Sequence, residues 1–194
     1  MPRVSQEQAK LNRQRVVEVA ATLFRERGLH GVGVADIMGA AGLTHGGFYG
    51  QFANKEALAA EAFDTALVNN RRGPSDSLVS NYLSLAHVRA PGVGCPIAAL
   101  ATDVAREAPD SPVRSRFTHG VRGLAALVAE AVPRTAKRKR ERTLSSLATL
   151  VGAVVLARAV DDEALAEEIL SAARASLGSG APGTQTAMSL SNDG

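Results

Sequence analysis

Apolar residues recur at helical spacing along almost the whole chain, and this pattern constrains the fold more than any other feature. Residues three or four positions apart share one face of an α-helix, and such faces recur from Val16 to Ala173. No stretch alternates apolar and polar residues between hairpin turns, as a half-buried strand would. The sequence therefore predicts an all-α fold of nine helices, four before a domain boundary near residue 73 and five after it.

Glycine and proline mark where these helices begin and end. Gly28 is expected to end the first helix, and Gly73-Pro74-Ser75-Asp76 interrupts the pattern after the fourth. One helix is expected over residues 78–86, and Pro96 occupies the favoured first position of the next one. Residues 178–194 are rich in Gly, Ser, Thr, Pro and Asn, which predicts a disordered tail.

Length, charge and cysteine content limit the class of protein. A chain of 194 residues can hold a three-helix module and a second core. Its 22 Lys and Arg against 19 Asp and Glu leave a net charge of +3, so any nucleic-acid-binding surface has to be local. The one cysteine, Cys95, permits no intramolecular disulfide, which suits a reducing compartment. No apolar run approaches the roughly 18 residues of a membrane span and no signal-peptide pattern opens the chain, which predicts a cytoplasmic protein outside the membrane.

Patterns typical of enzymes and metal sites are missing from the sequence. It has no Gly-rich phosphate loop, no Cys or His cluster at metal-binding spacing and no nucleophile elbow between a strand and a helix. A protein that merely coats DNA would carry more positive charge and no large apolar second domain. We therefore expect neither an enzyme nor a user of metal ions or cofactors. The histidines share no common helical face; they are His30, His45, His87 and His119.

A helix-turn-helix is predicted in the first third of the chain. A short helix from Val34 to Ala41 would be followed by a turn at Gly42-Leu43 and a second short helix from Thr44 to Gln51. Gly42 permits the left-handed backbone of the turn, and Phe48 and Phe52 should face the core with Leu43. The exposed side of the second helix would then display Thr44, His45, Gly46, Gly47, Tyr49 and Gln51.

At these positions the sequence resembles the TetR family of bacterial transcriptional regulators. The resemblance covers residues 12–63 closely and the remainder only in the number and length of helices. Val34 departs from the pattern, because the family usually has there a threonine that contacts a phosphate. The matching residues are Ala20, Leu23-Phe24, Gly28, Gly31, Val34, Ile37, Ala41-Gly42-Leu43-Thr44, Gly47-Phe48-Tyr49, Phe52 and Asn54-Lys55-Glu56-Ala57-Leu58.

The resemblance implies three regions and a DNA partner. It implies a helix-turn-helix DNA-binding domain over residues 1–53, a connecting helix over 54–73 and a ligand-binding and dimerisation domain over 74–177. The second short helix would enter the major groove of a palindromic operator in double-stranded DNA. The expected function is a sequence-specific DNA-binding transcriptional regulator, acting as a ligand-released repressor.

The resemblance also assigns roles within the reading segment. His45, Gly46 and Gly47 would lie nearest the base edges. Tyr49 and Lys55 would bind phosphates, and Lys55 would be helped by the positive amino end of the fourth helix. Thr44 and Gln51 could contact either a phosphate or a base. The structural alternatives are a half-buried packing role for Tyr49 and an ordinary exposed polar side chain for His45.

For the second domain the resemblance implies a homodimer and an inducer of unknown identity. The dimer would form through the last two helices, expected over residues 144–160 and 165–177. The first of these is apolar most of the way round and needs cover on two sides; burial inside one subunit is the alternative. The interface candidates are Leu150, Gly152, Val154, Leu156, Leu165 and Ile169. The candidates for contact with a small-molecule inducer are Tyr82, Cys95, Leu100, Phe117, Val121 and Leu147.

Cys95 permits a second regulatory hypothesis. It is expected at or just before the start of a helix, where the helix dipole favours a thiolate. Redox or electrophile sensing through Cys95 is therefore the alternative to release by a bound ligand. The structural alternative is a small buried apolar residue.

Overall fold

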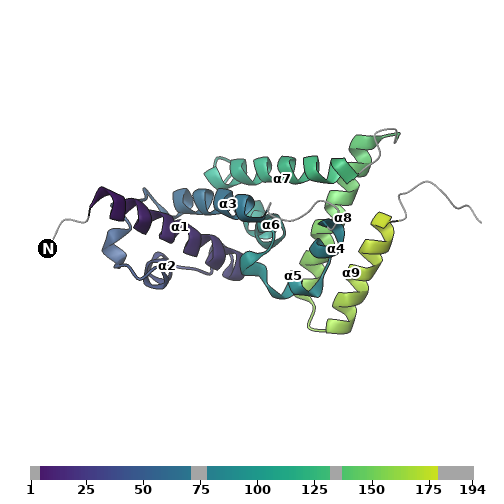
Figure 1. Cartoon of the computed structure of the whole chain (residues 1–194), viewed down its shortest axis with the longest axis horizontal. Coiled ribbons are helices and arrows are strands. Elements are labelled where there is room, and N and C mark those ends of the chain that lie inside the picture. The colour runs from purple at the N-terminus through teal and green to yellow at the C-terminus, as the bar shows by residue number, and fades with distance from the viewer. Residues whose placement is uncertain (1–4, 71–77, 132–136, 179–194) are drawn as a thin grey trace, which may run out of the picture.

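The computed structural model describes residues 5–70, 78–131 and 137–178 of the chain. In these ranges the backbone forms nine α-helices and short 3-10 turns, with no strand (Figure 1), which confirms the all-α prediction. The elements are α1 (Gln6–Arg27), α2 (Val34–Ala40), η1 (His45–Gly47), α3 (Lys55–Asn70), α4 (Leu78–Tyr82), α5 (Leu85–Arg89), η3 (Pro91–Val93), α6 (Pro96–Arg106), α7 (Pro112–Ala131), α8 (Lys139–Ala159) and α9 (Glu163–Gly178).

The helices divide differently from the prediction, with three α-helices before residue 73 and six after it among the described residues. The single helix expected over residues 78–86 is two short helices, α4 and α5. Ser84 separates them, because its backbone is extended and its hydroxyl accepts a hydrogen bond from the backbone N–H of His87 at 3.2 Å, which starts a new helix. The predicted boundary at Gly73-Pro74-Ser75-Asp76 and the predicted tail beyond Gly178 lie outside the described residues.

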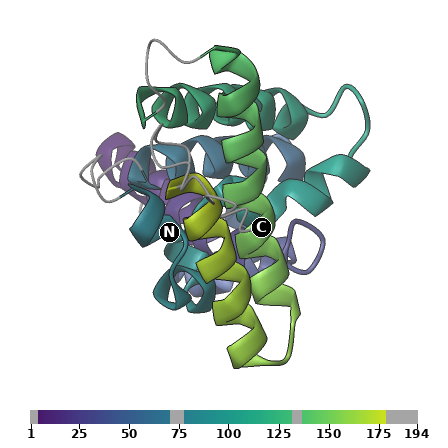
Figure 2. The same ribbon diagram turned by 90° about the vertical axis from the view of Figure 1, so that its right-hand side faces the viewer.

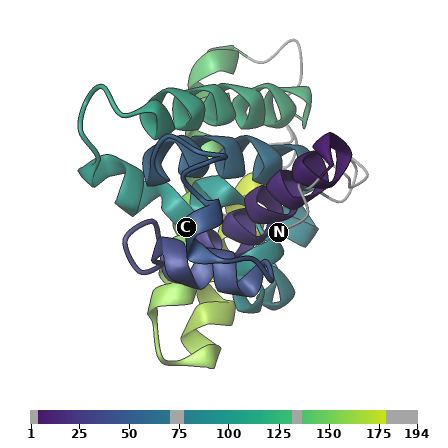
Figure 3. The same cartoon turned by 90° about the vertical axis from the view of Figure 1, so that its left-hand side faces the viewer.

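The helices α1, α2 and α3 with η1 form a small head at one end of the molecule (Figure 3). Gly28 ends α1 as predicted: its φ is +78° and its N–H donates to the carbonyl of Phe24 over 2.8 Å. Phe24 and Ile37 are buried between these helices, and Phe48 stacks on Phe52 with ring centroids 5.4 Å apart. A compact apolar core therefore holds the head together.

The long helix α3 belongs to the head and also contacts the rest of the molecule. It packs on α1 along one side and on α7 along the other (Figure 1). The helices α8 and α9 lie side by side at the end opposite the head, with α8 crossing α7 (Figure 2). The head and the α8–α9 pair are thus at opposite ends, connected through α3, α6 and α7.

The helix α8 is, among the described residues, the one helix long and apolar enough to cross a membrane by length and composition alone, with a mean hydropathy of 1.3 over 18 residues. The sequence predicted no such span. One side of α8 supplies Leu147, Leu150 and Val154 to the core of the protein. A helix that packs on both α7 and α9 has the same composition as a membrane helix, since both must bury apolar side chains.

Candidate functional site

The turn after α2 places the next segment on the outside of the head. Gly42 has φ +71°, a left-handed conformation that glycine adopts without steric cost. The N–H of Leu43 then donates to the carbonyl of Met38 over 2.9 Å, and the Leu43 side chain packs against the core. The predicted turn of the helix-turn-helix is therefore present at the predicted residues.

The segment after this turn is shorter than predicted as a helix. The α-helix expected from Thr44 to Gln51 is a 3-10 turn over His45–Gly47 followed by further turns. Its hydrogen bonds mostly span three residues, as from Gly47 N to Thr44 O at 3.0 Å and from Gln51 N to Phe48 O at 2.9 Å. The three glycines at positions 46, 47 and 50 explain the difference, because each weakens an α-helix by about 1 kcal/mol relative to alanine.

This reading segment, residues 44–51, presents most of the predicted DNA contacts to solvent. Thr44, His45, Gly46 and Tyr49 are exposed, whereas Gly47 is half-buried. Gln51 is also half-buried, and its amide donates to the carbonyl of Gly47 over 3.1 Å. Gln51 thus braces the turn from within, in contrast to the freely exposed side chain that the prediction assumed.

Tyr49 lies outside the core and is 67% exposed. Its ring meets the buried ring of Phe48 edge-on, with centroids 5.3 Å apart, and the ring of His45 at 5.8 Å. These contacts orient the ring and leave most of the residue exposed. The alternative of a half-buried packing tyrosine is therefore wrong.

Lys55 begins α3 next to the reading segment. Asn54 caps this helix, because its side-chain oxygen accepts a hydrogen bond from Ala57 N at 2.8 Å. The Lys55 ammonium lies 6.0 Å from the centroid of the Phe24 ring, and it stands at the positive end of the helix dipole. A lysine charge and the N-terminus of a helix at one place form a site suited to a phosphate.

The helix-turn-helix region matches a known family of regulators. Residues 16–62 match the model of the bacterial regulatory proteins of the tetR family. A protein named an uncharacterized HTH-type transcriptional regulator, MT0206 of Mycobacterium tuberculosis, is 30% identical over 168 residues that cover 75% of this chain and 84% of the relative. The chain belongs to the TetR family of transcriptional regulators. Members of this family are DNA-binding regulators and not enzymes.

Two further relatives extend the comparison. The HTH-type transcriptional repressor KstR2 of Rhodococcus jostii is 39% identical over 70 residues, which are 36% of this chain and 30% of that protein. The crystal structure of a TetR transcriptional regulator from Chloroflexus aurantiacus superposes with a TM-score of 0.65 at 28% identity, covering 90% of this chain and 96% of that one. The likeness to a TetR fold therefore extends well beyond the head.

In this TetR regulator the predicted dimer residues divide between two faces of α8 and α9. Leu150 and Val154 are buried within the protomer, together with Leu147. These two therefore do not face a partner, and their assignment to the interface is wrong. Leu156 is 56% exposed and Leu165 is 42% exposed, as an interface requires, and Gly152 and Ile169 are half-buried. The small or apolar residues on the outward face of α8 are Leu144, Ala148, Gly152 and Leu156.

The predicted inducer contacts are part of the core of the second domain. Buried within the protomer are Tyr82, Cys95, Leu100 and Leu147, and half-buried are Phe117 and Val121. A cleft of about 620 Å³ opens elsewhere, beside α1, and none of these six residues lines it. A role in ligand binding for them stays a prediction. In the described ranges no group of three or more His, Cys, Asp or Glu side chains is placed to hold a metal ion.

Cys95 immediately precedes α6, as predicted, and is 1% exposed. Its N–H donates to Nε2 of His87 over 3.0 Å, so the other ring nitrogen, Nδ1, carries the proton and donates to the carbonyl of Tyr82 at 2.7 Å. Burial lowers the pKa of His87, and burial with the neighbouring Cys95 raises the pKa of Tyr82. Sequence reasoning did not find this group as a unit, because Tyr82 ends α4, His87 belongs to α5 and Cys95 precedes α6.

Proposed function

We propose that the chain is a repressor that binds a palindromic operator as a homodimer and is released by a small molecule. The observation that carries DNA binding is the reading segment, in which Tyr49 points to solvent while Phe48 anchors the same turn in the core. The glycines of this segment leave its backbone uncovered, and it lies next to a helix N-terminus. Such a surface can contact the phosphates and base edges of a major groove. His45, Gly46 and Gly47 are the candidates for base contact, with Thr44, Tyr49 and Lys55 beside them.

The outward faces of α8 and α9 support a homodimer. Leu144, Leu156 and Leu165 are each at least 42% exposed in the protomer, and they stand on two adjacent helices at the end away from the head. A second copy would cover this face and form a four-helix interface, which is a frequent way to bury two amphipathic helices. Two heads could then engage successive major grooves of a palindrome.

Release by a ligand requires that the second domain and the head respond to one another. They touch through several contacts, among them the hydrogen bond from Arg25 Nη1 on α1 to the carbonyl of Gly94 at 3.1 Å. A ligand that favours one spacing of the two heads would weaken DNA binding. Bound DNA would then weaken the binding of the ligand by the same factor. The repressor role is supported by the name of the KstR2 relative. Membership of the TetR family supports a cytoplasmic location, which we also propose.

Selection of operator DNA from a random pool, followed by footprinting, tests this function. The expected result is protection of a palindrome at nanomolar protein and far weaker binding to scrambled DNA of equal length. Equal affinity for both DNAs would contradict sequence-specific regulation. The selected operator then serves to find the molecules that release it.

Sensing through Cys95 is the second candidate. Its polar neighbours favour it over a purely apolar role: His87 accepts a hydrogen bond from the Cys95 N–H, and Tyr82 is near enough for the two groups to interact electrostatically. A thiol reagent should then release operator from the protein and not from the Cys95→Ser variant. Release that is equal in both proteins would remove this candidate. Because the thiol is buried, we expect modification to be slow unless the domain opens.

A further inference from the structure

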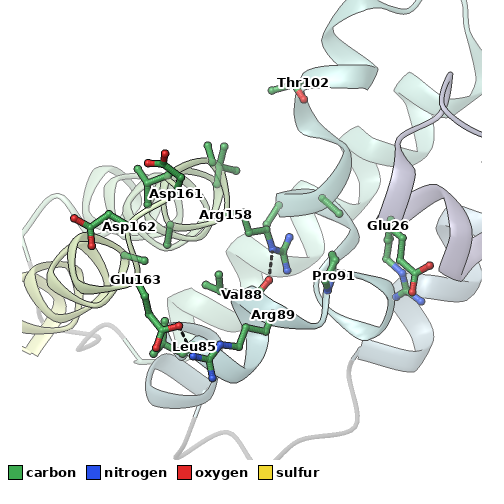
Figure 4. Close-up of a pocket in the computed structure, with 18 residues that line it drawn as sticks. Glu26, Leu85, Val88, Arg89, Pro91, Thr102, Arg158, Asp161, Asp162 and Glu163 are labelled. Carbon is green, nitrogen blue, oxygen red and sulfur yellow. Dashed lines mark hydrogen bonds and ion pairs between the residues drawn. The ribbon is translucent and has the colours of Figure 1, made fainter.

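A cleft of about 620 Å³ lies where the head meets the second domain (Figure 4). Its walls come from the end of α1, from α5 and α6, and from α8 with the start of α9. The volume is in the range typical of small-molecule sites. The apolar part of the lining consists mainly of Leu85, Val88, Pro91, Val155 and Val160.

Two arginines line this cleft without a carboxylate partner among the described residues. Arg25 is 7% exposed and donates from Nε to the carbonyl of Ala21 at 2.9 Å and from Nη1 to that of Gly94 at 3.1 Å. Arg158 donates to the carbonyl of Val88 at 3.3 Å (Figure 4) and to that of His87 at 2.9 Å. Both guanidinium groups are therefore bonded to neutral backbone only.

The guanidinium groups of Arg25 and Arg158 are unusual because they are largely buried and have no carboxylate beside them in an ion pair among the described residues. Burial lowers the pKa of both Arg25 and Arg158, and Nη1 of Arg158 is buried with no hydrogen-bond partner. Buried charges in proteins are normally paired, since an unpaired one loses its hydration without compensation. A bound anion would supply the missing partner.

The acidic residues of the cleft lie at its mouth and are exposed. Glu163 is paired with Arg89 at 2.5 Å, and Asp162 accepts a hydrogen bond from Ala164 N at 2.9 Å at the start of α9. Among the described residues Glu26 and Asp161 form no ion pair; the Glu26 side chain lies over Gly92, and its charge acts on Arg25 without forming a hydrogen bond to it. The cleft thus combines a positive inner wall, an apolar lining and a negative rim, which disfavours polyanions.

We propose that this cleft binds an amphipathic monocarboxylate, with its carboxylate at Arg25 and Arg158 and its apolar part along Leu85, Val88 and Val155. Because the cleft is formed by α1 of the head together with α8 and α9, such a ligand would bind across the junction between the two domains. Its effect on DNA binding rests on the proposed function, whereas the binding itself does not. The side chain of Arg158 would turn slightly so that Nη1 reaches the ligand.

Calorimetric titration of the full chain with decanoate, below its micelle concentration, tests the site. Decanol and decylammonium are the control ligands, because they have the same ten-carbon chain as decanoate and a neutral or a positive head group. Decanoate should bind at least tenfold more tightly than either. Tighter binding of decylammonium would show that the acidic residues at the rim determine the affinity. Equal binding of all three would show that the apolar lining alone does. Either result would overturn the proposal.

Variants locate the binding. Arg158→Gln and Arg25→Gln should each weaken decanoate at least tenfold, whereas Arg27→Gln, an exposed arginine of the same helix as Arg25 that does not line the cleft, should bind normally. Thr102→Trp fills the cleft from an exposed position on α6 and should block binding without removing a charge. Circular dichroism and melting curves identify a variant that has not folded, in which case Thr102→Trp decides. Normal binding by the folded variants would overturn the proposal.

Operator binding is measured separately on the same samples. Decanoate binding without selective DNA binding would contradict the proposed function and leave the site standing. Selective DNA binding by a protein that does not bind decanoate would overturn the site alone. The two failures are therefore distinguishable.

Discussion

The carboxylate of Asp103 on α6 accepts a hydrogen bond from the backbone N–H of Leu29, with Oδ2 and N 3.0 Å apart. Leu29 directly follows Gly28, the residue that ends α1. One helical turn further along, Glu107 pairs with His30 at 2.9 Å. The helix α6 is therefore attached to the head at its C-terminal end, and through Gly94 and Arg25 just before its N-terminal end. A movement of α6 would be transmitted to the head.

Replacing Asp103 tests this connection. Asp103→Ala leaves the N–H of Leu29 without its partner, and we expect the free energy of unfolding to fall by about 1–2 kcal/mol. Operator binding should also become less sensitive to an effector, because α6 and α1 are no longer joined at this end. Urea denaturation and operator titration with and without effector measure the two effects. Asp103→Asn keeps an acceptor oxygen and is the control; a loss as large as that of alanine would contradict the hydrogen-bond explanation.

Lys55→Ala should weaken operator and random DNA by the same factor. A phosphate contact carries little sequence information, so its loss lowers affinity uniformly and reduces the slope of log affinity against log salt by about one. Fluorescence anisotropy at several salt concentrations measures this slope. Lys139→Ala, at the start of α8 and away from the head, is the matched control. An unchanged slope in the Lys55 variant would exclude the phosphate role.

Leu156→Glu should convert the dimer to monomer. Leu156 is 56% exposed on the outward face of α8, and a carboxylate buried there in a dimer would lack a partner. Sedimentation at micromolar concentration should show at least a tenfold weaker dimer. The control is Val68→Glu on α3, which is 61% exposed outside the α8–α9 face. If both variants sediment as the original protein does, another surface forms the dimer.

His87 should make the fold less stable in mild acid. Burial holds its folded pKa below the usual 6.5, so the unfolded chain binds more protons as the pH falls below about 6.5. The stability contributed by neutral His87 is thus complete above that value and is lost as the pH falls toward the folded pKa. In urea denaturation at pH 7.5 and 5.5, His87→Gln should show a smaller loss in acid than the original protein. His119→Gln, exposed on α7, should retain the full loss.

Local signals predicted the helices and the turn of the head. Gly28, Gly42 and Pro96 each require or favour one backbone conformation, so the sequence shows where helices end, turn and begin. The same kind of reasoning underestimated how strongly three glycines within residues 44–51 disfavour an α-helix. They reduce the second helix of the motif to a 3-10 turn. The core contact of Phe48 anchors the segment but does not require an α-helix, so the low helix propensity of the glycines decides its conformation.

Contacts between distant segments could not be predicted. The helix α8 is apolar on both faces, so periodicity alone could not decide whether Leu150 or Leu156 faces the protomer core. Arg25 and Arg158 are 133 positions apart in the chain and line one cleft only because α1 and α8 meet near α6. Nothing in their sequence neighbourhoods distinguishes them from the other arginines.

The central claim is that the exposed reading segment recognises operator DNA. The most direct test compares the original protein with Tyr49→Ala in binding to the selected operator and to scrambled DNA. Because Tyr49 is exposed and Phe48 fills the core, the variant should melt at nearly the original temperature. We predict at least a tenfold loss of operator affinity in the folded variant. Unchanged operator affinity in a folded Tyr49→Ala protein would contradict the account.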